Sequence, residues 1–244
     1  MKKISSIVEG VKAILEDCEI SVHTPWEYVP ATDESLVDWV IFKGEKIPLF
    51  WWRYDNQIFP LADRAEEIKS VSCKLNTVTT REYGLDRLII RQCDIAEWIL
   101  RSQVARLNAY QKGGSAEIIL TMENKKVAIL ELAASLSSNI EEQGRLTVWG
   151  RQGMTSNRVV SQKDLPQSIY VYTESGKVDT YNDLCPMLYG LSKLDVIKVS
   201  AIVDVLRGTC DIKEIQSAYE RCEKYLKTCK KSAQENKPFK VKEM

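Results

Sequence analysis

Apolar residues recur at helical spacing at the start of the chain, and the pattern then changes to strand-like alternation. Short strands that alternate with helices predict a small parallel sheet in this part of the protein. The expected helices cover residues 5–18 and 60–70, and the expected strands are EISVHTP (19–25), SLVDWVIF (35–42) and KIPLFWW (46–52).

A longer helix is expected from about Arg81 to Arg101, with apolar residues along one side. After this helix the pattern changes to short runs in which apolar and polar residues alternate. Polar turns such as ENKK and ESGK separate these runs. Runs of this kind are typical of a largely antiparallel sheet. The runs are VARLNAY, AEIILTM, VAILELAASL, RLTVWG and SIYVYT.

Two more helices are expected near the end of the chain. Ser192 can cap the start of a helix that runs through Arg207, and Gly208 follows directly after the end of this helix. The last helix carries an apolar stripe in steps of three and four residues. Cys222 and Cys229 lie on this stripe, which indicates core packing rather than chemistry for both thiols.

The change of pattern near residue 80 predicts two domains. Residues 1–80 form a small α/β part, and residues 81–244 form a larger domain of sheet and helices. The sequence therefore predicts an α/β protein of the α+β kind, whose large sheet is open, mostly antiparallel and packed against helices.

The composition is that of a globular protein with balanced charge. Lys plus Arg is 34 and Asp plus Glu is 34, so no net field favours nucleic acid or an anionic membrane as a partner. No apolar run approaches the roughly 18 residues of a membrane span, and we expect the protein in the cytosol. Seven scattered cysteines without a CxxC pair argue against a disulfide framework or a metal site. They are Cys18, Cys73, Cys93, Cys185, Cys210, Cys222 and Cys229.

The segments after residue 80 follow a particular order: a helix with CDIAEWIL, VARLNAY, a two-glycine loop, AEIILTMENKKVAILELAASL, GRLTVWGRQG and a final helix that ends in KKSAQENKPFKV. This order resembles the C-terminal domain of the Gfo/Idh/MocA oxidoreductases. In that family a helix with Asp and Trp precedes a large open sheet, and the chain closes with a helix, a Ser-Ala pair and a Lys/Arg-Pro dipeptide. The resemblance covers roughly residues 80–241 and implies the open sheet through which the family's members typically associate.

The front of the chain resembles only the second half of the family's nucleotide-binding domain. VKAILEDCEISVHTP is similar to a helix and the fourth strand of that domain, where the strand ends in Thr-Pro beside the nicotinamide. KIPLFWWRY resembles the later strand that leads into the sheet domain. The resemblance thus implies a truncated Rossmann-like remnant, on which His23, Thr24 and Pro25 would contact a nucleotide if one binds.

A nicotinamide cofactor needs a glycine-rich turn whose backbone amides and following helix hold the pyrophosphate. The eleven glycines include no GxGxxG motif. Gly150 and Gly153 in GRQG come nearest, but they lie between strand-like runs, where a turn is the better explanation. We therefore expect no cofactor, and NAD(P) only if the chain is an oxidoreductase after all.

The helix that matches residues 84–100 carries the family's substrate-site carboxylate and the histidine that handles the hydroxyl proton. With Trp98 on the family's Trp and Asp94 on its second Asp, Arg91 falls at the histidine and Arg87 at the preceding acidic position. An arginine, with a pKa above about 12, cannot serve as a general base near neutral pH. The resemblance thus implies that both catalytic residue types are replaced.

Two interpretations of this arginine stripe remain open. In the first, Arg91 pairs with Asp94 and Glu97 pairs with Arg101 on a solvated helix face. In the second, Arg87, Arg91 and Asp94 bind an anionic or polyhydroxylated ligand through bidentate contacts. The first is favoured, and the mild repulsion between Arg87 and Arg91 is the main reason to keep the second.

Lys46 is the candidate catalytic residue under the enzyme hypothesis. The family uses a lysine in Glu-Lys-Pro, and GEKIP supplies Glu45, Lys46 and Pro48, although Ile47 intervenes. A lysine in a turn is the favoured interpretation.

The stretch FWWRY places aromatic side chains beside an arginine. Aromatic faces are natural platforms for sugar rings and for cations, which makes Trp52, Arg53 and Tyr54 candidate ligand contacts. Aromatic runs on a strand more often pack a core, and that interpretation is favoured.

These observations predict a Gfo/Idh/MocA-like protein that no longer transfers hydride and acts as a ligand-binding or assembly module. A sheet face as apolar as VAILELAASL must be covered, so a homodimer through the open sheet is expected. The alternative is an NAD(P)-dependent oxidoreductase of a sugar or cyclitol, with Lys46 handling the proton. A full-length family oxidoreductase is a possible partner, either as cofactor supplier or as an enzyme that this chain regulates.

Overall fold

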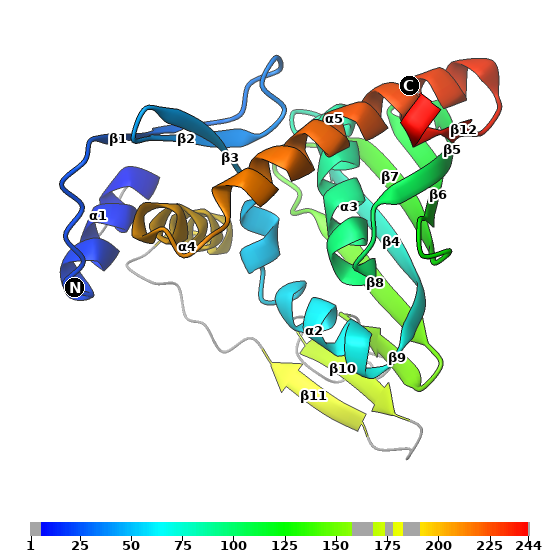
Figure 1. The fold of residues 1–244 in the computed structure, drawn as a ribbon, viewed down its shortest axis with the longest axis horizontal. Helices are drawn as coiled ribbons and strands as arrows, with labels where there is room; N and C mark the ends of the chain where they lie inside the picture. The colour runs from blue at the N-terminus through cyan, green and yellow to red at the C-terminus, as the bar shows by residue number, and fades with distance from the viewer. Residues whose placement is uncertain (1–5, 158–167, 174–177, 183–190, 244) are drawn as a thin grey trace. The chain divides into compact units, whose positions relative to one another are not determined.

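The computed structural model describes residues 6–157, 168–173, 178–182 and 191–243. The chain divides into two compact units: Met1–Asp55 with Leu184–Glu220, and Asn56–Asp183 with Arg221–Met244. Elements of the first unit are α1 (Ile7–Asp17), β1 (Trp26–Val29), β2 (Asp38–Phe42), β3 (Glu45–Leu49), the 3-10 helix η1 (Trp51–Tyr54) and α4 (Lys193–Arg207) (Figure 1). Helix α5 (Ile212–Glu235) begins in this unit and ends in the other.

The three strands of the first unit form an antiparallel sheet in the order β1-β2-β3, so the expected parallel sheet is wrong. Parallel strands need a long crossover between them, whereas these strands follow one another through short connections. The turn from β2 to β3 holds Lys43 and Gly44, both with positive φ, which is the backbone of a two-residue hairpin.

The expected strand EISVHTP is also wrong, because regular structure begins only at Trp26. The chain turns sharply after α1: Glu19 has a φ of 55°, and the N–H of Ile20 donates to the carbonyl of Leu15 at 2.8 Å. The expected helices over residues 5–18 and 193–207 are confirmed as α1 and α4. Ser192 caps α4 and Gly208 ends it in the left-handed conformation, as the sequence predicts.

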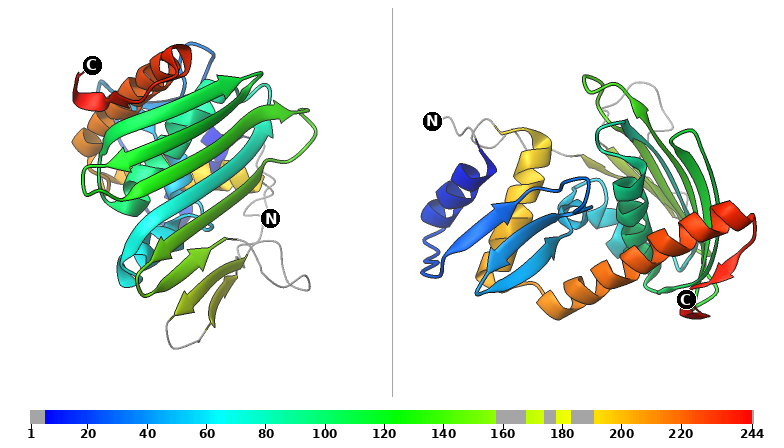
Figure 2. Two further views of the ribbon diagram at one scale, coloured as in Figure 1. Left: turned by 90° about the vertical axis from the view of Figure 1, so that its right-hand side faces the viewer. Right: turned by 90° about the horizontal axis from the view of Figure 1, so that it is seen from above.

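The second unit contains a sheet of nine described strands in the order β11-β10-β9-β8-β4-β7-β6-β5-β12 (Figures 1 and 2). Only β4 and β7 pair in parallel, so the predicted open, mostly antiparallel sheet against helices is confirmed. The strands are β4 (Ser70–Thr80), β5 (Val104–Lys112), β6 (Ser115–Met122), β7 (Val127–Leu136), β8 (Gln143–Gly150), β9 (Gly153–Ser156), β10 (Ser168–Thr173), β11 (Val178–Asn182) and β12 (Phe239–Lys240). The other elements are α2 (Phe59–Glu67), α3 (Leu85–Leu100) and η3 (Val241–Glu243).

Strand β4 is absent from the sequence-based prediction although it lies inside the sheet. Its run SVSCKLNTVTT carries only small and polar residues between its few apolar ones, which hides the alternation. The boundary expected near residue 80 falls between β4 and α3, which pack against each other within the second unit.

Alternate residues of the sheet face opposite sides. One side packs against α3 (Figure 2). This side buries Leu75, Leu130 and Ile118 among others. Most residues of the other side are half-buried or exposed, with Thr147 of β8 as a buried exception, and we call this side the open face. Its residues include Lys74, Asn76, Asn108, Tyr110, Glu117, Ile119, Ile129, Glu131, Arg145 and Trp149.

The buried cysteines pack in the core, as the stripe on the last helix predicts. Cys222 and Cys229 of α5 and Cys93 of α3 have no exposed surface. Burial also raises the pKa of the Cys73 thiol to about 12, which leaves it protonated at neutral pH. Cys185 lies outside the described residues. In the part of the chain that the structure describes, no helix is long and apolar enough to cross a membrane.

Candidate functional site

Helix α3 is the element on which the resemblance places catalytic residues. It begins after Gly84, whose φ is 81°, and ends at Arg101 in the left-handed conformation. Arg87, Arg91 and Asp94 are spaced by four and three residues and therefore share one side of the helix. Because Arg91 and Asp94 are 5% and 0% exposed, the expectation of a solvated helix face is wrong.

Arg91 is held by groups of its own unit. Its Nη2 donates to Glu142 Oε1 at 2.7 Å, and its guanidinium carbon lies 4.9 Å from the centre of the Tyr83 ring. An ion pair and a ring stack together fix a guanidinium that is always charged. Arg91 is thus a buried cation with defined partners, and Arg87, one turn earlier, is half-buried.

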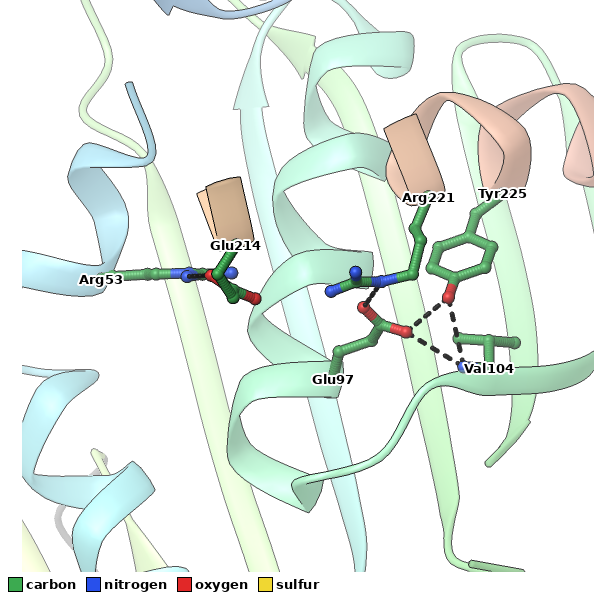
Figure 3. A network of polar contacts seen from close by, with 6 residues as sticks. All are labelled: Arg53, Glu97, Val104, Glu214, Arg221 and Tyr225. Atoms are coloured by element: carbon green, nitrogen blue, oxygen red, sulfur yellow. Dashed lines mark hydrogen bonds and ion pairs between the residues drawn. The ribbon is translucent and has the colours of Figure 1, made fainter. Parts of the chain in front are cut away.

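Glu97 forms a network that the sequence does not predict (Figure 3). Its carboxylate accepts from Arg221 Nε at 3.2 Å, from the N–H of Val104 at 3.1 Å and from the hydroxyl of Tyr225. The N–H of Val104 also donates to the Tyr225 hydroxyl at 3.3 Å. Glu97 and Arg101 were expected to pair with each other, but Arg101 pairs with Asp63 and Glu66 of α2 instead.

Burial dominates the electrostatics of this network. It raises the pKa of the Glu97 carboxyl above its usual range, although hydrogen bonds from Tyr225 and Arg221 oppose the shift. Burial and the neighbouring Glu97 also raise the pKa of Tyr225. The network therefore connects α3, α5 and the start of β5, and burial raises the pKa of both of its acidic groups, Glu97 and Tyr225.

The aromatic stretch of the first unit is mostly internal. Trp52 is 2% exposed, and its ring contacts those of Phe50 and Trp51 at centroid distances of 4.9 and 5.4 Å. Arg53 pairs with Glu214 at 3.2 Å, as Figure 3 shows.

Tyr54 of the same stretch lies beside Asp204, and burial followed by this carboxylate raises the pKa of its hydroxyl. Core packing is thus what the geometry shows for the rings, and a ligand role for Trp52, Arg53 or Tyr54 stays a prediction.

The remaining candidates of the first unit lie on its surface. Lys46 is exposed on β3, and its Nζ lies 4.4 Å from the centre of the Trp39 ring. His23, Thr24 and Pro25 lie in the irregular segment between α1 and β1. Their roles in catalysis or cofactor binding stay predictions.

The described strands of the first unit lack the usual dinucleotide-binding turn. Its three strands follow one another as hairpins, so none of them leads through a glycine turn into a helix N-terminus. Gly150 and Gly153 form the turn between β8 and β9, which confirms the interpretation of GRQG as a turn.

A buried ion pair of the first unit also escaped the sequence analysis. Lys198 of α4 pairs with Asp38 of β2 at 2.9 Å and donates to the Tyr28 hydroxyl at 3.3 Å. Asp38 also accepts from the N–H of Ala31 at 2.7 Å. Burial, and then the Asp38 charge, raises the pKa of Tyr28. The cluster fastens α4 to the small sheet, and no periodicity in the sequence brings these residues together.

On the open face of the large sheet, five polar side chains lie side by side in one row across the strands. The row runs Arg145, Asn76, Glu131, Glu117 and Tyr110 across β8, β4, β7, β6 and β5. The two oxygens of Glu131 accept from Lys74 at 2.5 Å and from Asn76 at 2.9 Å, and the contact with Lys74 lowers the Glu131 pKa.

Large apolar side chains are also exposed in the second unit. Tyr110 is 51%, Trp149 39% and Ile119 38% exposed, and all three belong to the open face. Tyr110, Glu117 and Glu131 line a hollow of about 580 Å³, which strands β4 to β7 and the end of α5 form.

The fold has known counterparts among solved structures. An oxidoreductase from Agrobacterium radiobacter, solved with NAD+, L-tartaric acid and magnesium, is 14% identical to this chain, with a TM-score of 0.68. That match covers 98% of this chain and 71% of the other. Scyllo-inositol dehydrogenase from Lactobacillus casei, solved with NAD(H) and scyllo-inositol, is 13% identical with a TM-score of 0.58. Levoglucosan dehydrogenase, solved with NADH and L-sorbose, is 10% identical with a TM-score of 0.60.

These solved proteins are Gfo/Idh/MocA-type oxidoreductases, and the chain has their fold. The resemblance predicted from the sequence is thereby confirmed at the level of structure. Each of the two dehydrogenases matches 79% of this chain, which spans 64% of their own lengths. No family model matches the sequence, and no curated protein does.

Proposed function

We propose that this chain is a non-catalytic protein of the Gfo/Idh/MocA fold. The observation that carries the proposal is Arg91, which stands where the resemblance places the proton-handling histidine. A guanidinium bound to Glu142 and stacked on Tyr83 cannot take up a proton from a substrate hydroxyl. Arg87 replaces the acidic residue one turn earlier, so both expected groups have changed chemical type.

A titration with NADH and NADPH, followed by nicotinamide fluorescence, tests the proposal. We expect no saturable binding, because the 244 residues contain no GxGxxG turn and the described strands of the first unit do not lead into a phosphate-binding helix. Saturable binding in the micromolar range would support the rival function instead. That rival is an oxidoreductase of a sugar or cyclitol, for which Lys46 is the proton-handling candidate.

The positive role that we propose is assembly through the open face of the large sheet. Tyr110, Trp149 and Ile119 expose apolar area on one side of a sheet whose other side is packed against α3. Exposed apolar area of this kind is favourably buried against a second surface. We therefore propose a homodimer, in which each copy covers the open face of the other.

Light scattering coupled to size exclusion measures the assembly directly. The expected mass at micromolar protein is twice the 27.9 kDa of one chain. Replacing Ile119 with an aspartate should shift the protein toward the monomer, because a charge would then be buried between two sheets. Replacing Lys227 of α5, which is exposed and not on the sheet, with glutamate is the control. A wild-type mass of one chain would remove the support for assembly and leave a ligand-binding role.

A further inference from the structure

Two opposite charges on the open face are without partners inside the described chain. Glu117 of β6 and Arg145 of β8 are both exposed, and neither forms an ion pair or a side-chain hydrogen bond with any described residue. Their neighbour Glu131 differs, because Lys74 and Asn76 occupy both of its oxygens.

Glu117 stands in an unfavourable place for a carboxylate. It lies directly opposite Glu131 on the adjacent strand, and like charges at such positions repel each other. Its other cross-strand neighbour is Tyr110, whose ring is half exposed. A cationic group above Glu117 would thus relieve the repulsion and would also contact an aromatic ring. The hollow beside Tyr110 gives such a group access.

Arg145 has the chemistry and the position to supply this cation from a second copy. Arg145 and Glu117 belong to the same cross-strand row, on β8 and β6. Between these two strands lie only β4 and β7, in the order β8-β4-β7-β6. The two charges are therefore placed symmetrically about a line that runs along the strands between β4 and β7.

We infer that a second copy of this chain docks on the open face about that line as a two-fold axis, so that Arg145 of each copy binds Glu117 of the other. The inference rests on the assembly role proposed above and names its partner and its register. A two-fold axis makes every contact occur twice, so one arrangement satisfies all four charges. Sheets pack about 10 Å apart, a gap that arginine and glutamate side chains can bridge together. The same rotation places Ile119 of one copy over the β8 position of Thr147, whose own side chain is buried within its chain.

Charge reversal at each position tests the pairing. In Glu117→Arg and in Arg145→Glu, both contacts of the homodimer become repulsive, and we expect the dissociation constant to rise by about tenfold or more. The double variant Glu117→Arg/Arg145→Glu carries the pairs in swapped order and should dimerise like the wild type. Mixing the two single variants should produce a heterodimer, because each mixed contact joins opposite charges. Native mass spectrometry distinguishes this heterodimer from both homodimers by mass, and circular dichroism of each variant confirms that it folds.

The outcomes separate the two proposals. If the wild type is a monomer, the assembly role fails and this pairing fails with it. If the wild type is a dimer whose affinity neither single variant changes, the assembly role stands and the pairing is overturned. Single variants that dissociate without rescue in the mixture or the double variant also overturn it, since repulsion must then act on other partners. Lys227→Glu changes the net charge by the same amount as Arg145→Glu and is the control for that variant.

Discussion

Replacing Gly150 with alanine is expected to lower the free energy of unfolding by about 3 kcal/mol. A Cβ atom at this position would lie 2.0 Å from the carbonyl oxygen of Ile68 and 2.7 Å from its carbonyl carbon. Both atoms belong to the backbone at the end of α2, so no side-chain rotation removes the clash. Urea unfolding followed by tryptophan fluorescence, at one fixed protein concentration, measures the loss.

The backbone around Ile68 cannot retreat without losing other contacts. Its carbonyl accepts from the N–H of Gln152 at 3.0 Å, and the N–H of Arg151 donates to the carbonyl of Lys69 at 3.2 Å. Lys69 itself already has a φ of 51°. Moving this segment would therefore break the hydrogen bonds that hold the β8–β9 turn against α2.

Gly144, on the same strand, is the matched control. A Cβ atom there would have Thr77 Oγ1 as its nearest neighbour, at an ordinary distance of 3.8 Å. Gly144→Ala should leave the protein unchanged or stabilise it by about 0.5 kcal/mol, because alanine restricts the unfolded chain. Equal stabilities for the Gly150→Ala variant and the wild type would show that the close approach to Ile68 does not exist.

The segments with strong periodicity could be predicted from the sequence. Helices α1, α3, α4 and α5 show apolar residues at helical spacing, and β5 to β8 alternate clearly between polar turns. The spacing of apolar residues within each segment is enough to predict its type, and in a strand a one-residue shift would expose the whole apolar side. Strand β4 lacked this signal, since Ser, Thr, Asn and Lys fill most of its positions.

The small sheet shows where local pattern is not enough. The run EISVHTP alternates as a strand does, yet the left-handed turn at Glu19 directs the chain away from regular structure. Strand direction also depends on connections, and short links between β1, β2 and β3 force antiparallel pairing where alternation with helices suggested parallel strands.

The candidate site was predicted in part. Sequence reasoning located Arg87, Arg91 and Asp94 on one helix, but it placed their helix face in solvent. The partners of buried charges come from distant segments: Glu142 lies 51 residues from Arg91, and Tyr225 lies 128 residues from Glu97. No local pattern encodes such pairs. A glutamate within the apolar run DIAEWIL was the available signal, because a buried carboxylate requires donors from elsewhere.

Tyr225→Phe is expected to lower the free energy of unfolding at neutral pH by about 2 kcal/mol. The hydroxyl donates to the buried Glu97 carboxylate and accepts from the N–H of Val104, so its removal weakens the contacts of both groups. The control is Ser138, which is exposed in the segment after β7, and Ser138→Ala should change the stability by less than about 0.5 kcal/mol.

The loss in Tyr225→Phe should depend on pH in a direction that the Glu97 pKa fixes. Burial raises this pKa in the folded protein, so the fold binds the Glu97 proton more tightly than the unfolded chain does. Stability from this group is then complete below the unfolded pKa of about 4.3 and declines as pH rises through the folded pKa. Because the Tyr225 hydroxyl opposes the rise, its removal raises the folded pKa further and enlarges the decline.

Urea unfolding of the wild type and Tyr225→Phe at pH 4.5 and pH 8 should therefore show the larger difference at the higher pH. Repeating the pair in a Glu97→Gln background removes the titrating group, and the difference should become independent of pH. A pH-dependent difference that persists without the carboxylate would mean that another group titrates, and that Glu97 is not the charge that Tyr225 stabilises. Arg221 keeps its guanidinium in all four proteins, so the comparison isolates the hydroxyl and the carboxylate that it contacts.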